Sequence, residues 1–404
     1  MRKKQKMKKI PYGRQWIDQS DINEVVKVLK SDWLSQGPKI REFEEAIAKY
    51  CGAKYAVAVS SGTAGLHLAY CVAGMGKGDE VITTPMSFLA TANAAVFTGA
   101  TPIFADIDYD TVNIDPEEIQ KKLTKRSKAI VPVHFAGLPV DLKEIAAIAR
   151  RRDLIVIEDA CHALGAEYRG KKIGSCQYSD ITVFSFHPVK HITTGEGGCI
   201  TTNNRDFYKK MLQMRHHGIG RPQSARRRVG NWFYQMNNIG FNYRITDFQA
   251  ALGLSQLRKL DFFLKRRREI AEQYGEALQS LGEKVILPKL HYPDRKHAWH
   301  LYLFRLNLKK TSIHRRRFYE ALQEYGVMSQ VHYIPITHHP YYQRHLAKSS
   351  LRHPKTERYY QEVVSLPMYP RLTSRDVQLV IAAVKEILDG VFNKSKKRKK
   401  PVVF

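Results

Sequence analysis

Short apolar runs alternate with helical stretches between residues 55 and 202, and this alternation limits the possible folds more than any other feature. Several runs are apolar throughout, as strands covered on both faces of a parallel sheet are. Segments of helical composition, such as 141–152 (DLKEIAAIARRR), lie between them. The pattern predicts a wound α/β domain with a mainly parallel sheet. The expected strands are 55–60, 80–84, 102–106, 129–133, 154–158, 181–186 and 199–202.

A long helical segment and a smaller region follow the alternating part. Residues 245–281 contain no proline and few glycines, and their apolar residues occupy more than one side of a helix. A helix of this kind is buried between layers or subunits. Strand-like runs at 301–308 and 331–336 then predict a small α+β domain. The expected organisation is a basic disordered tail (1–9), a large domain (10–250), a connecting helix region (251–284), a small C-terminal domain (285–392) and a second basic disordered tail (393–404).

The chain is strongly basic, with a formal net charge of +28. Residues 2–9 and 394–400 each carry six positive charges and almost no apolar residue to bury, so both tails are expected to be disordered. Affinity for nucleic acid or an acidic membrane is the alternative interpretation. The body carries no nucleic-acid-binding motif, so we expect no nucleic-acid partner. Shorter basic clusters at 150–152, 226–228, 265–268 and 315–317 are expected to be solvated, although one could meet an anionic substrate.

Cysteine spacing and hydropathy narrow the class of protein further. The five cysteines are scattered without paired or metal-type spacing, which suggests a reducing compartment, no disulfide framework and no metal site. No apolar run approaches the roughly 20 residues needed to span a bilayer. The basic N-terminus lacks the apolar segment of a signal peptide. We therefore expect a cytoplasmic protein without a membrane span.

Three of the expected strands are followed by residues that suggest a ligand site, because ligands of wound sheets gather at the carboxyl ends of the strands. Ser60–Ala64 are small and precede a helix, whose free N–H groups suit a phosphate, although a capped turn would have the same sequence. Asp159 follows an apolar strand, where an unpaired carboxylate is costly, and a structural ion pair is the common alternative. Lys190 follows another strand, where partly apolar surroundings make an amine a nucleophile for carbonyls.

One cofactor, pyridoxal phosphate, requires all three features at once. It needs a lysine for a Schiff base, a carboxylate that keeps the pyridine nitrogen protonated, and a cup for the phosphate. Lys190, Asp159 and the 60–64 turn supply these groups. The sequence therefore predicts a pyridoxal-phosphate site at the carboxyl edge of the sheet.

Longer motifs around these residues resemble one enzyme family. The segments GTAGLHLA (62–69), EVITTPMSFLATANA (80–94), EDACHALGA (158–166), FSFHPVKHITTGEGG (184–198) and GFNYRITDFQAALGLSQL (240–257) are similar to the DegT/DnrJ/EryC1/StrS sugar aminotransferases. The similarity extends from about Ile10 to Leu388. It implies the fold of type I pyridoxal-phosphate enzymes, with a large mainly parallel-sheet domain that binds the cofactor and a small C-terminal α+β domain.

The resemblance assigns roles in cofactor binding. Lys190 would carry the cofactor, and Asp159 would pair with its ring nitrogen. Phe88 stands where the family places a ring over the cofactor, and His162 stands where the family often has glutamine near the phenolic oxygen. Asn242 matches an asparagine that reaches the phosphate from the neighbouring subunit, which implies a homodimer with shared sites. The implied phosphate contacts are Gly62, Thr63, Ala64 and Ser185.

The same resemblance points to loops that would bind the sugar nucleotide, although ordinary loop packing is the alternative for each of them. These residues are Tyr12, the 33–36 segment (Trp33, Leu34, Ser35 and Gln36), Ser60, and the 332–337 loop (His332, Tyr333, Ile334, Pro335, Ile336 and Thr337). His187 and His191 flank the lysine, and a packing or hydrogen-bonding role is expected for both.

The implied reaction is amino transfer from L-glutamate to C4 of a UDP-linked 4-keto-6-deoxy-N-acetylhexosamine. The motifs LSQGP (34–38) and VHYIPI (331–336) most resemble the branch of the family in the pseudaminic acid pathway, whose product is UDP-4-amino-4,6-dideoxy-N-acetyl-β-L-altrosamine. In this reaction the freed amine of Lys190 would move the proton.

Three alternatives remain at this point. Another nucleotide 4-keto sugar of the UDP-bacillosamine or GDP-perosamine type could be the acceptor. A sugar dehydratase on the same scaffold would have histidine in place of the lysine, and Lys190 argues against it. A non-catalytic regulatory or nucleic-acid-binding protein with a vestigial cofactor site would suit the net charge, but every motif residue is intact.

Overall fold

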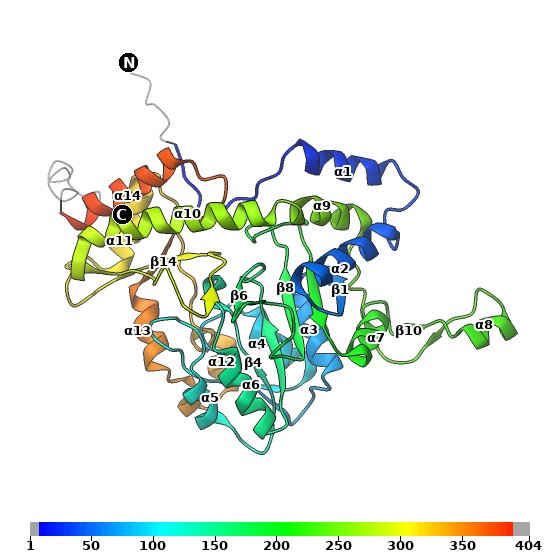
Figure 1. Ribbon diagram of the computed structural model, residues 1–404. Coiled ribbons are helices and arrows are strands. Elements are labelled where there is room, and N and C mark those ends of the chain that lie inside the picture. Colours follow the sequence, from blue (N-terminus) through cyan, green and yellow to red (C-terminus); the bar gives the residue numbers. More distant parts are fainter. Residues whose placement is uncertain (1–7, 391–404) are drawn as a thin grey trace, which may run out of the picture.

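A computed structural model describes residues 8–390 of the chain, and Figure 1 shows its arrangement. A seven-stranded sheet forms the centre, in the order β1-β9-β8-β5-β4-β2-β3. β9 runs antiparallel to both of its neighbours, and the remaining neighbours are parallel. All seven expected strands are therefore confirmed. Their bounds are β1 Tyr55–Val59, β2 Glu80–Thr83, β3 Thr101–Phe104, β4 Ser127–Val131, β5 Ile155–Asp159, β8 Ile181–Ser185 and β9 Gly198–Thr202.

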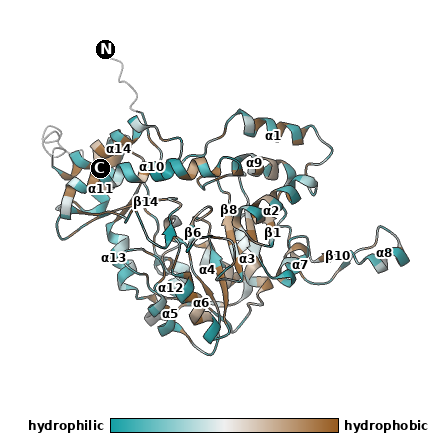
Figure 2. Ribbon diagram, in the orientation of Figure 1, coloured by the Kyte–Doolittle hydropathy of each residue, from teal (hydrophilic) through white to brown (hydrophobic). Residues whose placement is uncertain are grey.

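Helices cover both faces of this sheet, which explains why its strands are apolar throughout. Because side chains alternate along a strand, Val57 and Val59 of β1 pack in one core cluster and Ala56 and Ala58 in another. The hydropathy colouring shows apolar strands at the centre of the molecule and helices of mixed colour around them (Figure 2). The helices of this part are α2 Pro38–Cys51, α3 Gly62–Val72, α4 Ala90–Thr98, α5 Pro116–Lys122, α6 Leu142–Arg151 and α7 Arg205–Met214.

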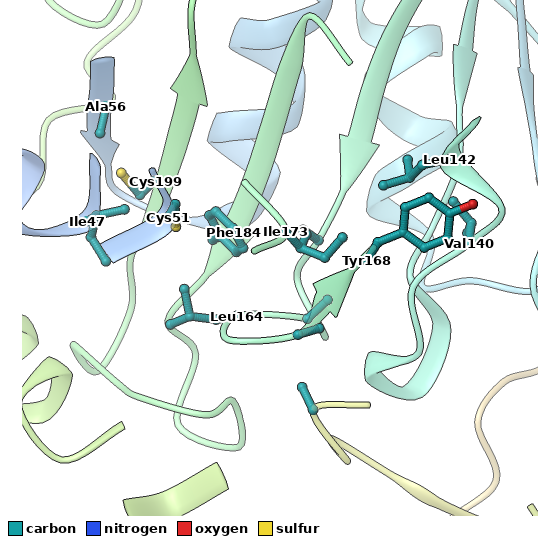
Figure 3. Close-up of a cluster of buried hydrophobic side chains, with 14 of the residues drawn as sticks. Ile47, Cys51, Ala56, Val140, Leu142, Leu164, Tyr168, Ile173, Phe184 and Cys199 are labelled. Atoms are coloured by element: carbon teal, nitrogen blue, oxygen red, sulfur yellow. The ribbon is translucent and has the colours of Figure 1, made fainter. Parts of the chain in front are cut away.

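The face covered by α2 and α6 contains large side chains in close contact. Ile47 of α2, Phe184 of β8 and Leu142 of α6 belong to one buried cluster (Figure 3). Tyr168 of the small β6 strand joins them and is only 1% exposed. Short strands at the rim of this face are β6 Glu167–Tyr168, β7 Lys171–Lys172 and β13 Arg295–Lys296.

The helical segment expected at 245–281 is two consecutive helices, α9 Asp247–Leu257 and α10 Leu260–Leu278. α9 packs against α2 and against α1 Gln19–Leu29. α10 connects two cores, because Leu260 and Phe263 belong to the sheet cluster whereas Tyr274 and Leu278 belong to the C-terminal cluster. The expectation of a buried helix between layers is confirmed, with an interruption at residues 258–259.

The C-terminal region contains a second, antiparallel sheet made of β12 Val285–Ile286, β14 Tyr302–Leu306 and β15 Val363–Leu366. The expected strand at 301–308 is confirmed. Ile10 packs into this C-terminal cluster and forms a parallel bridge with Val327. The helices of this region are α11 Arg315–Glu324, α12 Pro340–His345, α13 Pro354–Glu362 and α14 Ser374–Leu388.

The expectation of a strand at 331–336 is wrong. Pairing with β15 stops at Gln330, and the following residues form a loop. Tyr333 N–H donates to Met86 Sδ at 3.3 Å, and Ile336 N–H donates to Pro85 O at 2.9 Å. The loop therefore binds the segment after β2 instead of a neighbouring strand.

An extension, here called the arm (residues 219–239), projects from the base of α7 away from the body (Figure 1). It contains β10 Ile219–Gly220, α8 Gln223–Val229 and β11 Gln235–Met236. Most of its large apolar side chains are exposed, and Trp232 (75%) and Ile239 (76%) are the most exposed of them.

The expected tails fall mostly outside the described residues. Of the first tail only residues 8 and 9 are described, and Lys8 Nζ lies 2.5 Å from Asp376 Oδ1 at the start of α14. The second tail, 393–404, lies entirely beyond them. Within residues 8–390, no helix combines the length and the apolar character that a membrane crossing requires.

Candidate active site

A cavity of about 380 Å³ opens at the carboxyl ends of β1, β4, β5 and β8. The turns after these strands line one side of it, and residues from the N-terminus and the C-terminal region line the other. The lining residues are Tyr12, Ser61, Gly62, Thr63, Leu66, Ser87, Phe88, Ala90, Val133, Asp159, Cys161, His162, Ser185, His187, Val189, Lys190, Glu196, His300, His332 and Tyr333.

The N-terminus of α3 forms one wall of the cavity. Ser61 is the N-cap residue, and its hydroxyl oxygen accepts the Ala64 N–H at 3.0 Å. The N–H groups of Gly62 and Thr63 lie in the first helical turn, where backbone N–H groups have no partner within the helix. Together with the helix dipole they form an anion site beside Ser185 at the end of β8.

Glycine is required where this wall is most crowded. A Cβ atom on Gly62 would lie 2.8 Å from Ser185 Cβ and 3.2 Å from Cys161 Sγ. On the other side, a Cβ atom on Gly198 would lie 2.6 Å from Ser61 O. The two glycines therefore allow α3, β8 and β9 to meet closely enough to form a narrow cup.

Asp159 is a buried carboxylate that forms no ion pair within residues 8–390. Its side chain is 5% exposed. Oδ2 accepts the Thr91 hydroxyl at 2.6 Å and Oδ1 accepts the Cys161 N–H at 3.1 Å. None of the ion pairs formed within residues 8–390 involves Asp159. A buried charge needs a partner, and a protonated ring nitrogen in the cavity would supply it.

Lys190 lies in the turn after β8 and is partly exposed to the cavity. Its N–H donates to His187 O at 2.9 Å, which fixes the turn. Burial lowers the pKa of the Lys190 amine, and the carboxylate of Asp159 opposes this shift. A larger share of neutral amine is therefore present near neutral pH than for an ordinary lysine, as a nucleophile requires.

Uncharged imidazoles surround the lysine. Burial is the main cause that lowers the pKa of His162 and His300 well below the ordinary value, and the Lys190 charge adds to it. The pKa of His332 is about 3 for the same two reasons. The rings of His162 and His300 lie 4.3 Å apart. These side chains therefore stay neutral at physiological pH and act as hydrogen-bonding groups.

His162 and Tyr333 connect the two sides of the cavity. The Tyr333 hydroxyl lies 3.2 Å from His162 Nε2, and burial raises the pKa of Tyr333, so the hydroxyl keeps its proton. His162 Nδ1 is buried and has no hydrogen-bond partner among the described residues. On the cavity's outer side, the rings of Tyr12 and His332 lie 5.5 Å apart.

The residues of the cavity fit pyridoxal phosphate. A lysine with a lowered pKa, an unpaired buried carboxylate and an anion cup line one space, which is the set of groups that this cofactor requires. The exposed ring of Phe88 projects into the same space and lies 6.1 Å from the Tyr333 ring.

The structure brings together most of the residues expected to bind the cofactor, but fewer of those expected to bind the substrate. Gly62, Thr63, Phe88, Asp159, His162, Ser185 and Lys190 line the cavity, and so do Tyr12, His332 and Tyr333. The expected residues outside the lining are Ala64, Asn242, Trp33, Leu34, Ser35, Gln36, Ser60, Ile334, Pro335, Ile336 and Thr337.

These outlying residues have other contacts. The 33–36 segment lies against the start of α9, where Asp247 N–H donates to Leu34 O at 3.0 Å. Ile336 is buried with Phe104 and Tyr342 in a separate small cluster. Asn242 is exposed beside the arm, where its backbone pairs with His216.

Sequence reasoning missed several lining residues. His300 precedes β14 in the segment HAWHLY (297–302), which carries no recognised signal, and it reaches the cavity only because its N–H donates to Ala136 O at 2.8 Å. Ser87 directly precedes the expected Phe88, whereas Glu196 is adjacent to no expected site residue, and only their position in space identifies both.

Comparisons with known proteins agree on one family. The model of the DegT/DnrJ/EryC1/StrS aminotransferase family matches residues 15–385. The chain is 46% identical over 380 residues to an uncharacterized protein of Methanocaldococcus jannaschii, covering 94% of this chain and 97% of that protein. It is 43% identical over 383 residues to the spore coat polysaccharide biosynthesis protein SpsC of Bacillus subtilis, covering 94% and 97%.

Solved structures are similar over nearly the whole chain. Helicobacter pylori PseC, described as an aminotransferase in the biosynthesis of pseudoaminic acid, is 33% identical with a TM-score of 0.88, covering 95% of this chain and 100% of that one. The PLP form of a putative sugar aminotransferase from Streptococcus pneumoniae, Spr1654, is 28% identical with a TM-score of 0.87, covering 95% and 99%.

Proposed function

Because the chain belongs to the DegT/DnrJ/EryC1/StrS aminotransferase family, we propose that it transfers an amino group from L-glutamate to C4 of a UDP-linked 4-keto-6-deoxy-N-acetylhexosamine. The product would be UDP-4-amino-4,6-dideoxy-N-acetyl-β-L-altrosamine, as in the pseudaminic acid pathway. The chain is a sugar aminotransferase that depends on pyridoxal phosphate. The observation that carries the proposal is the meeting of Lys190, Asp159 and the α3 N-terminus in one cavity.

Each of these groups has a separate task. The bound cofactor supplies an electron sink for the amino-transfer chemistry. Asp159 would hold the proton on the ring nitrogen, and the Gly62 and Thr63 N–H groups with Ser185 would bind the phosphate. Lys190, which carries the cofactor at rest, would move the proton at the reacting carbon once its amine is free.

The other lining residues would orient the substrate and limit water access. Phe88 would cover the ring of the cofactor, and His162, whose Nδ1 has no hydrogen-bond partner among the described residues, would contact the cofactor from the lining. Tyr12, His332 and Tyr333 form the wall on which the sugar would rest. Since His332 stays neutral and burial raises the pKa of Tyr12, this wall would contact the sugar without adding a charge.

We also propose that the active unit is a homodimer with shared sites. Three anionic groups must bind near the cavity: the cofactor phosphate, the glutamate carboxylates and the nucleotide diphosphate. Among the described residues that line the cavity, Lys190 is the single lysine and arginine is absent. Asn242 and the exposed Arg221, Arg227 and Arg228 of the arm lie outside the cavity of their own chain, where a second subunit could receive them.

Subunit mixing tests the shared site. Lys190→Ala and Asn242→Ala subunits, each inactive alone, should regain part of the activity when mixed, because one hybrid site contains both residues. Subunit exchange is followed by mass spectrometry of differently tagged chains. No recovery despite exchange would show that Asn242 acts within its own subunit or not at all.

A substrate comparison tests the proposed acceptor. The 4-keto sugar with the L-arabino arrangement should give a higher kcat/KM with glutamate than its D-xylo epimer at C5. Epimers are distinguished when buried polar groups lose their partners, which commonly changes specificity by 10-fold or more. A GDP- or dTDP-linked sugar that reacts faster than both would overturn the pathway assignment and leave the aminotransferase assignment unchanged.

One observation favours a second acceptor. The chain is more similar to the Bacillus subtilis spore coat protein (43%) than to Helicobacter pylori PseC (33%). Sequence identity therefore does not single out the pseudaminic acid pathway. The D-xylo keto sugar, which would give a bacillosamine-type product, differs from the first acceptor at C5 and is the second candidate, and the same kcat/KM comparison decides between the two.

A further inference from the structure

Two buried hydroxyl groups support the carboxylate of Asp159 from the side of α4. Thr91 Oγ1 lies 2.6 Å from Asp159 Oδ2, and Ser87 Oγ lies 2.9 Å from Thr91 Oγ1. Thr91 is 0% exposed and Ser87 is 4% exposed, so water does not compete for these contacts.

The chemistry of the three groups gives the chain of hydrogen bonds a direction. An ionised carboxylate only accepts hydrogen bonds, so Thr91 must donate its single hydroxyl proton to Asp159. Ser87 must then donate to Thr91 Oγ1. With Oδ1 accepting the Cys161 N–H at 3.1 Å, both oxygens of the Asp159 carboxylate have fixed partners.

The protein also fixes Thr91 itself. Its residue lies in the first turn of α4, and its backbone carbonyl accepts the Tyr70 hydroxyl at 2.9 Å. Phe88 lies between Ser87 and Thr91 in the sequence, and its carbonyl accepts the Thr91 N–H at 3.4 Å. The same turn therefore positions both Phe88, which lines the cavity, and the hydroxyl that bonds Asp159.

We propose that Thr91 is a positioning residue for the cofactor. Its hydroxyl holds Asp159 in the orientation that pairs with the ring nitrogen, and Ser87 holds the Thr91 hydroxyl in place. This inference rests on the role of Asp159 in the proposed function. Without the hydroxyl, Oδ2 loses a buried donor, and the carboxylate can rotate away from the ring.

Four variants test the chain of hydrogen bonds from Ser87 through Thr91 to Asp159, which is called the relay below. Thr91→Val removes the hydroxyl at nearly constant volume, Thr91→Ser keeps it, and Ser87→Ala removes the second donor. Thr98→Val is the matched control, because Thr98 lies on the same helix and its hydroxyl bonds only the Ala95 carbonyl among the contacts described for it. Apoprotein is titrated with pyridoxal phosphate by absorbance, and the pH dependence of the bound cofactor's spectrum is recorded.

Thr91→Val should bind pyridoxal phosphate roughly 10-fold more weakly, since a buried hydrogen bond to a charged group is lost, and the pH midpoint of its spectrum should shift. Ser87→Ala should show a smaller change in the same direction, whereas Thr91→Ser and Thr98→Val should match the unmodified protein. Thermal unfolding of each apoprotein shows whether the variant is folded.

Two results would overturn the relay. One is a Thr91→Val protein with unchanged affinity and spectrum. The other is a Thr91→Ser protein as impaired as Thr91→Val, because the methyl group would then be the important part. If Thr91→Val does not fold, the cofactor affinity and spectrum of Thr91→Ser and Ser87→Ala test the proposal. Asp159→Asn separates the two proposals: an unchanged cofactor spectrum in that variant contradicts the role of Asp159 itself.

Discussion

The cavity and the arm contrast in what their side chains contact. Around the cavity, polar groups such as Asp159 and Thr91 are buried and hydrogen-bonded within one chain. In the arm, the large apolar side chains of Trp232 and Ile239 are about three-quarters exposed, at 75% and 76%. Asp159 and Thr91 therefore have hydrogen-bond partners within one chain, whereas Trp232 and Ile239 present apolar surface to solvent, and large exposed apolar surface marks an interaction site.

A single chain therefore brings together the groups of the cavity, but it leaves apolar side chains of the arm exposed. Lys190, Asp159 and the N-terminus of α3 lie at or after strand ends of a single sheet, and one chain brings them together in the cavity. The arm projects away from the body of the molecule (Figure 1), and the nearby Asn242 is exposed. We therefore expect changes in the cavity to abolish chemistry without affecting assembly, and changes in the arm to affect assembly first.

The largest effect should follow from Lys190→Ala. The variant should lose roughly 10²–10⁴-fold or more in turnover, as expected when a group that transfers protons is removed. It should also lose covalent fixation of the cofactor by borohydride, while sedimenting like the unmodified protein. Lys171→Ala, at an exposed lysine of β7, is the control. Reductive labelling at any other lysine would contradict the assignment.

The next effect should come from the arm. In the double variant Trp232→Ala/Ile239→Asp, dimer affinity should fall roughly 100-fold or more, because each large apolar side chain contributes about 1.5–3 kcal/mol when buried. Analytical ultracentrifugation measures the dissociation constant. Leu379→Asp, at an exposed apolar position of α14 (47%), should leave assembly unchanged. A double variant that remains as tightly dimeric as the parent would exclude the arm from the interface.

Acidification should lower the free energy of unfolding through His332, a residue of the cavity lining. His332 has a pKa of about 3 in the folded chain because of burial, compared with about 6.5 in an unfolded chain. The unfolded state therefore binds more protons between these values, and stability falls as pH decreases below 6.5. At pH 5 this single group should cost about 2 kcal/mol.

The arm contains no histidine, so its contacts should not titrate in this window. Urea unfolding of the protein at pH 7 and pH 5 measures the loss, and His332→Gln should make the pH dependence less steep. His291→Gln, at an exposed histidine, should leave it as it is. Equal slopes for the parent and His332→Gln would show that His332 is protonated in the folded chain.

The smallest effect should follow from removing the tails. Deletion of residues 1–7 and 394–404 removes most of the terminal charge runs and no motif residue. Turnover at moderate salt should change less than about twofold, since screened surface charges contribute little. The Lys8–Asp376 ion pair is retained in this variant. A large fall in turnover would assign the tails a part in substrate binding.

Most of the sheet and the centre of the site could be predicted from local sequence. Strands covered on both faces are apolar throughout, and this made β4 and β8 recognisable. Lys190 and Asp159 are recognisable because burying a charged residue at the end of an apolar strand costs free energy unless it has a partner. The 331–336 segment has the composition of a strand, but it forms a loop that is hydrogen-bonded to the segment after β2.

Other features depend on contacts between distant residues. His300 lines the cavity because its backbone binds the large part of the molecule, and no local pattern indicates this. Thr91 lies in an ordinary helical turn, and its significance appears only when Asp159, 68 positions later, is found 2.6 Å away. The interruption between α9 and α10 at Arg258 and Lys259 could not be predicted either, because the sequence contains no proline or glycine at these positions.

Arg267 of α10 has a consequence for the motion of the molecule. Its buried guanidinium donates to the carbonyl groups of Trp299, His300 and Met368, at 3.1, 3.3 and 3.0 Å. His300 N–H in turn donates to Ala136 O at 2.8 Å. A rotation of the C-terminal region against Arg267 and Ala136 would have to break several of these bonds together, so we expect the cavity to keep a nearly constant width. Selection among sugars then depends on the fit to a preformed shape, and the rate of entry depends on side chains at the rim.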